Sequence, residues 1–317
     1  MAMLRPKSTL QEVDDTEEYL NSKGFEKMDI GSCKKYLKMV EEHGLRRPMP
    51  VYAAAGLVIE NEKKAKISKQ EKYAVVEQLA LAALDLNDTP TARRVVEQLY
   101  LVFPKSVRVG KIEGMCLESE GKWEEALKKY DELLEKSPAE QRVMKRKVAV
   151  YKSQGRTTEA IDELTKYLDT FMGDFAAWEE LALLYAECRM YQQAVFCWEE
   201  VIVAQPQMHY HHRRIAEVYY TMGGEDHLRA ARKYYAAAAD MSNATDARAL
   251  YGLTLVNARL AKFEQKRLAG GRGGASTNAD DDSVGPDLSA VAGQFLCKLY
   301  AVANAGLLPV VERVLKK

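Results

Sequence analysis

Residues 175–208 read FAAWEELALLYAECRMYQQAVFCWEEVIVAQPQM, and their pattern indicates the class of fold. The stretch contains two runs in which apolar residues recur every three or four positions, as they do on one face of an α-helix. Ala182 in the first run and Ala194 in the second are small enough to let two helices approach closely. Pro206 ends the second run, because proline cannot continue a helix. The stretch therefore predicts a pair of packed helices.

The same pattern recurs along the chain at a fixed period. Alanines at positions 92, 126, 160 and 194 are separated by 34 residues, and Ala230 follows after a shift of two. A period of 34 residues is that of tetratricopeptide helix pairs. We therefore expect an all-α, tetratricopeptide-type right-handed superhelix (an α-solenoid). Its units are predicted near residues 73–106, 107–140, 141–174, 175–208 and 209–244, with a partial unit at 245–262.

Within each unit, small and bulky residues alternate at fixed offsets from the repeated alanine. A bulky residue follows each alanine by four positions, and a small or slim residue precedes it by twelve. These offsets place the residues on the faces along which two helices pack. We expect the repeat to be held together by Ala92, Gly114, Ala126, Tyr130, Ala160, Trp178, Ala182, Tyr185, Ala194, Trp198, Ala230 and Gly252.

The turn inside each unit carries a residue that accepts a left-handed backbone. Five positions before the alanine stand Asn87, Gly121 and Gly155, and Gly223 serves the fifth unit. Glycine and asparagine close helices readily in this conformation. Arg189 occupies the same position in the fourth unit, so we expect that turn to be strained or differently shaped.

Both ends of the chain depart from the repeat. Residues 1–72 are predicted to form an N-terminal tail and capping helices: a loosely ordered segment to residue 30 with at most a short helix at 14–20, a helix capped by Ser32, and another at 51–61. Residues 263–287 are rich in Gly, Ser, Asp and Asn and predict a flexible loop. Residues 288–317 predict a C-terminal capping helix, broken at Gly306 and Pro309, and a tail.

Composition gives little reason to expect nucleic acid or membrane as a partner. Lysine plus arginine and aspartate plus glutamate both number 46, so the formal net charge is zero. No signal-peptide segment and no apolar run of about 18 residues is present. The five cysteines form no CxxC pair, which suits reduced thiols in a cytoplasmic protein.

The sequence also predicts neither an enzyme nor a cofactor. It contains no GxSxG elbow, P-loop, GxGxxG after a strand, or HExxH. His209 and His212 share a helical face next to His211, but no further ligand stands close by in sequence to complete a metal site. The abundant carboxylates lie on amphipathic helices and are interpreted as solvated faces.

A local cluster of basic residues is the strongest candidate for function. In the tetratricopeptide fold, positions two, five, nine and twelve of each first helix line the inner groove, and these positions hold most of the cluster. The predicted partner-binding groove consists of Arg108, Lys111, Arg142, Lys145, Arg146, Lys152 and Arg213. A merely solvated helix face is the alternative. The asparagines of the clamp by which co-chaperones hold acidic chaperone tails are replaced by Met115 and Ala149.

Beyond the repeat, several stretches resemble the family of subunit 2 of the ER membrane protein complex. They are residues 103–138, 145–185 and 219–241, including the FMGD turn at 171–174 and the Gly223-Gly224 insertion. The resemblance implies a subunit without a membrane span, peripheral on the cytosolic face of the endoplasmic reticulum. It implies a hetero-oligomeric scaffold that organises cytosolic segments of membrane subunits for transmembrane-segment insertion and pairs with another soluble subunit.

Two other classes of function remain open. One is a general cytosolic tetratricopeptide adaptor or co-chaperone, which purification with its partners would distinguish from a subunit of an ER complex. The other is an enzyme or nucleic-acid binder built on a helical array, which the missing motifs and neutral charge disfavour.

Overall fold

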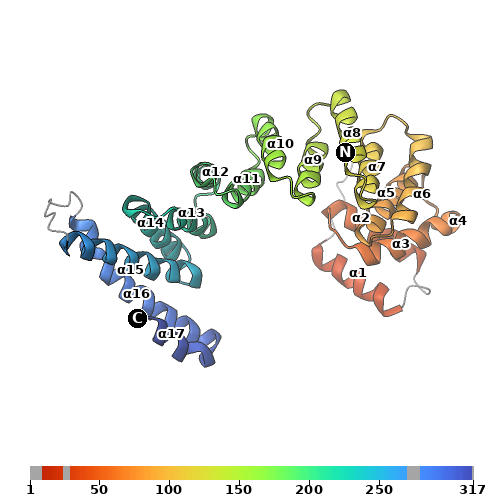
Figure 1. Cartoon of the computed structure of the whole chain (residues 1–317). Helices are drawn as coiled ribbons and strands as arrows, with labels where there is room; N and C mark the ends of the chain where they lie inside the picture. Colours follow the sequence, from red (N-terminus) through yellow and green to blue (C-terminus); the bar gives the residue numbers. More distant parts are fainter. Residues whose placement is uncertain (1–8, 24–28, 270–278, 316–317) are drawn as a thin grey trace, which may run out of the picture. The chain divides into compact units, whose positions relative to one another are not determined.

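The computed structural model describes residues 9–23, 29–269 and 279–315, and these residues form helices and connecting turns without a strand. The chain divides into two compact units, residues 1–154 and 155–317, which we describe one at a time (Figure 1). Successive helices pair along each unit. The predicted all-α fold of the tetratricopeptide type is confirmed.

Unit 1 holds the N-terminal helices and the first helix pairs of the repeat. The pair α5/α6 corresponds to the first predicted repeat unit and α7/α8 to the second, while α9 ends unit 1. The helices of unit 1 are α1 (Leu10–Lys23), α2 (Ile30–His43), α3 (Pro48–Glu60), α4 (Glu62–Ala65), α5 (Lys69–Asp85), α6 (Thr89–Val102), α7 (Val107–Ser119), α8 (Trp123–Lys136) and α9 (Gln141–Ser153).

Unit 2 begins with α10 and continues with the pairs α11/α12 and α13/α14, after which two longer helices follow. The helices of unit 2 are α10 (Thr157–Thr170), α11 (Phe175–Glu187), α12 (Tyr191–Ala204), α13 (His209–Met222), α14 (Glu225–Met241), α15 (Ala247–Ala269), α16 (Ala279–Ala303) and α17 (Leu308–Leu315), with a short 3-10 turn at Ala305–Leu307 between the last two.

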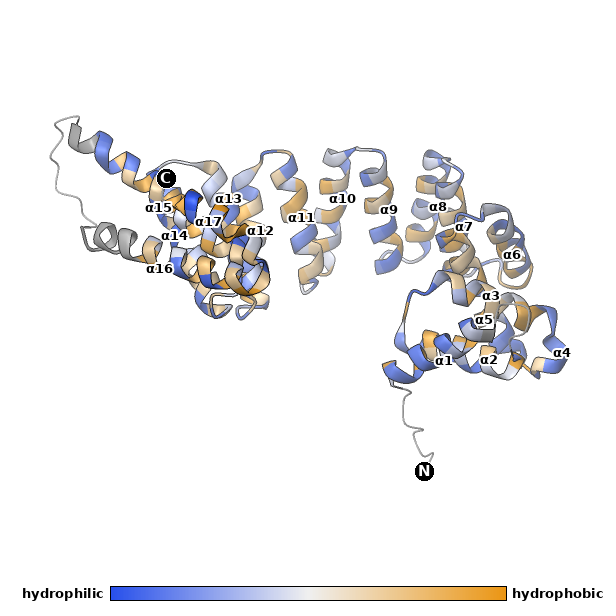
Figure 2. Cartoon of the chain, turned by 90° about the horizontal axis from the view of Figure 1, so that it is seen from below, coloured by the Kyte–Doolittle hydropathy of each residue, from blue (hydrophilic) through white to orange (hydrophobic). Residues whose placement is uncertain are grey.

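The small and bulky residues of the repeat meet where helices pack. Figure 2 shows apolar and polar residues alternating along most helices, as expected of amphipathic segments. The alanines Ala92, Ala126, Ala160 and Ala194 are fully buried, as predicted. A Cβ atom on Gly114 would lie only 2.3 Å from the ring of the buried Tyr130, so glycine is required there. Trp198 is buried as well, whereas Trp178 and Tyr185 are half-buried.

The turns inside the first four units follow one geometry, including the turn at Arg189, whereas Gly223 in the fifth unit combines a φ of 70° with an extended ψ of −172°. The φ angles are 75° at Gly121 and 70° at Gly155, and Arg189 adopts the same left-handed region with φ of 60°. The amide of the following residue, Met190, donates to the carbonyl of Tyr185 at 2.8 Å, which parallels the bond from Lys122 to Leu117 in the second unit. The turn is therefore not differently shaped. The turn is strained, however, because a residue other than glycine is disfavoured in the left-handed region.

The register predicted for the fifth unit is wrong by one residue. Ala231 is fully buried, while Ala230 is only half-buried. Likewise Tyr235 is buried, and its ring lies 2.3 Å from the position of a Cβ atom on Gly252. The insertion at Gly223 and Gly224 therefore shifts the packing face by three residues and not by two.

The described part of the N-terminal region is more helical than the sequence suggested. Helix α1 begins before the predicted short helix, and its residues Val13 and Leu20 are fully buried. These residues are seven positions apart and so share one face of the helix. Helix α2 is capped by Asp29, whose side chain accepts from the amide of Ser32 at 2.8 Å, so Ser32 lies inside the first turn.

The helices near the C-terminus extend into the segment predicted as a loop. Helix α15 continues to Ala269 and α16 begins at Ala279, and residues 270–278 of the predicted loop lie outside the described residues. Pro309 does not end a helix but stands in the first turn of α17, where its missing amide costs nothing. Within the described ranges, no helix combines the length and apolar content needed to cross a membrane.

Candidate partner-binding site

Unit 1 contains a hollow of about 550 Å³ on the side of its first helices. The helices α5, α7 and α9 supply most of its lining, and the end of α2, the start of α3 and the turn between them supply the rest. The repeat explains this arrangement, because equivalent positions of successive first helices point the same way. Positions two, five and nine of two units line the hollow: Ala74, Glu77 and Leu81 on α5, and Arg108, Lys111 and Met115 on α7.

The wall of this basic hollow carries six basic and three acidic residues. Some of the cations are neutralised locally. Arg108 Nη2 lies 2.8 Å from Glu77 Oε2, and Arg46 Nε donates to Asp85 Oδ2 at 2.7 Å. The lining thus combines an excess of positive charge with an apolar floor that includes Leu81.

Lys111 is the cation best placed to bind an anion. Its side chain is half-buried, and in the part of the chain that is described no carboxylate forms an ion pair with it. Burial lowers the pKa of the Lys111 ammonium, and the charge of Arg142 lowers it further, against a partial opposing effect of Glu77. Arg142 itself is exposed and likewise makes no ion pair among the described residues. An anion in the hollow would therefore relieve an unfavourable concentration of positive charge.

Arg146 has a different, structural role in the same wall. Its guanidinium donates two hydrogen bonds to the carboxylate of Glu118, with Nε at 3.1 Å from Oε1. The hydroxyl of the buried Tyr130 donates to the same carboxylate. Burial raises the pKa of Tyr130, and the neighbouring Glu118 adds to the shift, so the phenol stays protonated. This network ties α7, α8 and α9 together below the hollow.

The structure brings four of the seven predicted groove residues to the hollow: Arg108, Lys111, Arg142 and Arg146. Lys145 and Lys152 are exposed on α9 and do not line it. Of the two neighbouring predicted residues on α9, Arg146 lines the hollow, held there by its ion pair with Glu118, and Lys145 does not.

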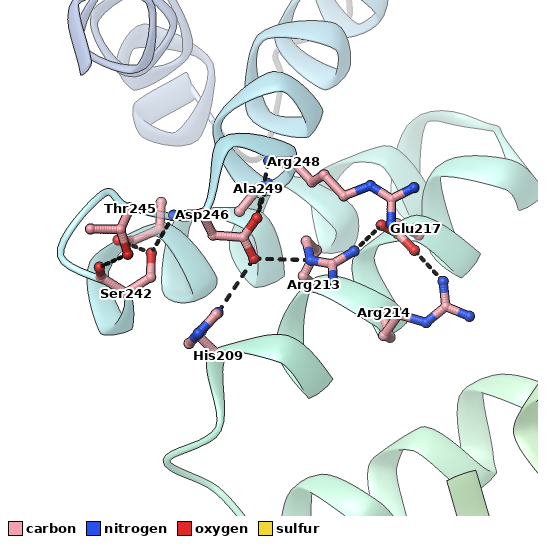
Figure 3. A network of polar contacts seen from close by, with 10 residues as sticks. His209, Arg213, Arg214, Glu217, Ser242, Thr245, Asp246, Arg248 and Ala249 are labelled. Carbon is pink, nitrogen blue, oxygen red and sulfur yellow. Dashed lines mark hydrogen bonds and ion pairs between the residues drawn. The ribbon is translucent and has the colours of Figure 1, made fainter. Parts of the chain in front are cut away.

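Arg213 belongs to unit 2 and is not an available groove cation. It is only 7% exposed and bridges two carboxylates, with Nε 2.9 Å from Asp246 Oδ2 and Nη1 2.6 Å from Glu217 Oε1 (Figure 3). Asp246 also accepts from the amides of Arg248 and Ala249 and thereby caps α15. The network fastens α13 to the start of α15, which corrects the predicted role of Arg213.

The side chains of the neighbouring histidines contact polar groups of the folded chain. His211 Nε2 pairs with Gln205 Oε1 at 3.0 Å, and His212 Nε2 pairs with the carbonyl of Pro206 at 2.9 Å. His209 Nδ1 lies 3.3 Å from Asp246 Oδ2. Across the described ranges, no group of three or more His, Cys, Asp or Glu residues is arranged to hold a metal ion.

Sequence reasoning missed the part of the hollow that comes from outside the repeat. Arg46 and Arg47 reach it from the turn between α2 and α3, together with Glu41 from α2. The repeat register does not extend to residues 1–72, so it assigns these side chains no direction. The adjacent arginines at a helix break were the available signal.

Comparison with known sequences shows close relatives. The EMC2 TPR-like repeat domain family matches residues 98–228. The chain is 38% identical over 201 residues to ER membrane protein complex subunit 2-A of Xenopus laevis, a match that covers 63% of this chain and 67% of the frog protein. It is 35% identical over 192 residues to ER membrane protein complex subunit 2 of Dictyostelium discoideum, covering 60% of each chain. TPR repeat protein oca3 of Schizosaccharomyces pombe is 34% identical over 168 residues, covering 52% of this chain and 60% of that protein.

Comparison with solved structures agrees with the fold. The C-terminal part of a TPR repeat-containing protein from Cytophaga hutchinsonii matches with a TM-score of 0.58 at 14% identity, covering 85% of this chain and 96% of that one. At this identity the likeness concerns the fold alone. The relatives in frog and slime mould share far more of the sequence, and on that evidence the chain belongs to the family of ER membrane protein complex subunit 2.

Proposed function

We propose that the protein is a non-enzymatic scaffold subunit of an ER membrane protein complex, and that its basic hollow binds an acidic segment of a partner subunit. The observation that carries the second part is the half-buried Lys111 beside Arg142, neither of which makes an ion pair with any described residue. Family membership supports the first part, and tetratricopeptide helix pairs are suited to binding extended or helical segments.

The physical basis is the partial exclusion of water from the hollow. A carboxylate that reaches Lys111 replaces the hydration that the ammonium lost on folding, and the attraction is stronger there than on an open surface. The apolar floor at Leu81 and Met115 offers area for neighbouring apolar side chains of the same segment. The expected partner segment therefore mixes acidic and apolar residues.

In the cell, the proposal assigns the protein to the cytosolic face of the endoplasmic reticulum. It would be held there by membrane subunits and would gather their cytosolic segments during insertion of transmembrane segments, with a further soluble subunit as a second partner. Attachment through proteins predicts that an alkaline carbonate wash releases the chain from membranes. Retention after the wash would show direct insertion into lipid.

A charge reversal in the hollow tests the binding proposal. Tagged full-length chain carrying Lys111→Glu and Arg142→Glu should recover its membrane partners about ten-fold less well than the parent after mild-detergent purification, because carboxylates would face carboxylates. Recovery with the parent should also fall as salt rises. The matched control is Lys128→Glu with Lys136→Glu, which changes the charge equally at exposed positions of α8 in the same unit.

Mass spectrometry of the recovered proteins and circular dichroism melting curves decide the outcome. The proposal requires that the control behaves as the parent and that the double reversal melts normally. A folded double reversal that recovers membrane partners in parental amounts would contradict docking in the hollow. Recovery of cytosolic proteins alone by the parent would favour a general adaptor.

A further inference from the structure

Unit 2 contains a second hollow, of about 580 Å³, formed by α10, α11 and α12. We name it the Trp178 hollow after the indole in its lining. Leu168 and Leu181 are buried parts of its wall, and Met172 and Phe196 are also among its lining residues. The wall is thus mainly apolar, although it lies open to solvent.

The large side chains around the Trp178 hollow are exposed but held in place. Met172 is 72% exposed and Phe196 is 54% exposed. The indole of Trp178 donates from Nε1 to the carbonyl of Met172 at 2.9 Å, and its ring meets the ring of Phe196 edge to face at 6.0 Å. The indole nitrogen is therefore satisfied, and the apolar wall exists before any partner binds.

The repeat itself does not demand apolar residues at these exposed positions. The position of Phe196 is held by Asp162 one unit earlier and by Lys128 two units earlier. Val203 is 78% exposed and lies seven positions after Phe196, on the same face of α12. Its position is held by Asp169 one unit earlier and by Glu135 two units earlier. Helix α12 thus carries apolar side chains where α8 and α10 carry charges, which marks its outer face as an interaction surface.

The segment that forms the Trp178 hollow is acidic, and the hollow's own lining holds one carboxylate and no cation. Residues 157–204 contain ten acidic and two basic side chains, and α11 and α12 contain neither lysine nor arginine. Asp169 lines the hollow, and Asp162 is exposed on the same helix. Over the described part of the chain, neither aspartate makes an ion pair, whereas Lys166 between them is paired with Glu163 at 2.9 Å.

We infer that the Trp178 hollow is the docking site of a basic amphipathic segment from a partner protein. Apolar side chains of the segment would fill the hollow against Trp178 and Phe196, and its lysines or arginines would pair with Asp162 and Asp169. An acidic segment or an anionic bilayer would be repelled by these carboxylates. The inference does not depend on the basic hollow of unit 1, which has the opposite charge and would bind an acidic segment.

Site-directed photocrosslinking in the assembled complex tests this inference. The photoreactive residue p-benzoylphenylalanine replaces Phe196 in full-length protein, and complexes purified in mild detergent are irradiated. We expect a crosslink to a protein segment with apolar residues at helical spacing and several lysines or arginines. The matched control carries the same residue at Lys128, the equivalent position of α8, and should give about ten-fold less product.

Variants at the surface then separate the apolar and charged contributions. Phe196→Ser and Asp169→Lys each change an exposed residue, so both proteins should melt as the parent does. With the photoreactive residue moved to Val203, each variant should lower the crosslink about ten-fold. The inference is overturned by parental crosslinking in both variants, by no product above the Lys128 control, or by crosslinks to lipid, to an acidic segment or to a second copy of this chain.

Discussion

At the residue scale, the fold depends on pairs of one small and one large residue where two helices approach most closely. Gly114 on α7 and Tyr130 on α8 form such a pair. The tyrosine hydroxyl donates a hydrogen bond to the carboxylate of Glu118, which also accepts from Arg146. One contact therefore serves both the packing of the second repeat unit and the wall of the basic hollow.

Gly114→Ala should destabilise the protein even though alanine favours helices. The added Cβ atom would lie 2.3 Å from the Tyr130 ring, and relieving such overlap costs about 1–3 kcal/mol. Gly56→Ala in α3 is the control, because no atom lies within 4 Å of its added Cβ and the change should stabilise by roughly 0.5–1 kcal/mol. Urea denaturation of both variants measures the difference. A Gly114→Ala protein as stable as the parent would show that this contact is looser than described.

The sequence predicted which residues pack at helix contacts better than it predicted which charged side chains are available for binding. Glycine and alanine at a fixed period correctly indicated close helix contacts, since small residues have few other reasons to recur at 34-residue spacing. Arg213 shows where this reasoning ends. Its sequence position suggests an exposed cation, but the carboxylates that bury it come from its own helix and from Asp246, 33 residues away.

At the scale of elements, ion pairs between helices distinguish the buried network of unit 2 from surface pairs. The side chains of Arg213 and Asp246 are 8% and 10% exposed, and they join α13 to α15. Removing one partner leaves the other charge buried and uncompensated.

Arg213→Ala should therefore lower stability by about 3–5 kcal/mol. Lys166→Ala removes an ion pair with Glu163 within α10, but the lysine side chain is 66% exposed, and the loss should stay within about 0.5 kcal/mol. Thermal melting followed by circular dichroism compares the two. Equal, small losses for both variants would mean that the network in Figure 3 contributes no more than a surface pair.

Element boundaries were predictable wherever the repeat applied. The helices α5 to α12 follow the 34-residue period. Helices α1 and α16 lie outside it and were underestimated, and α15 extends past the predicted partial unit at 245–262. An insertion such as that at Gly223 and Gly224 can also displace the register by an amount that spacing alone does not give, as the burial of Ala231 shows. The packing of Tyr235 against Gly252 settles that displacement through a contact between different helices.

At the scale of the whole molecule, zero net charge conceals two hollows of opposite sign. The basic hollow belongs to unit 1 and the acidic, apolar Trp178 hollow to unit 2. The sequence predicted the first in part, because Arg108, Lys111 and Arg142 stand at inner repeat positions and line it, whereas Lys145 and Lys152 at such positions do not. It did not predict the second, because exposed apolar residues on α12 resemble core residues until the burial of each side chain is known.

The most direct test of the scaffold account is an experimental structure of the assembled complex purified with this chain. We expect polypeptide density in the basic hollow between α5, α7 and α9, with carboxylates of a partner subunit within about 4 Å of Lys111 Nζ and the Arg142 guanidinium. An assembled complex in which that hollow holds no partner segment, while the membrane subunits contact the chain elsewhere, would contradict it.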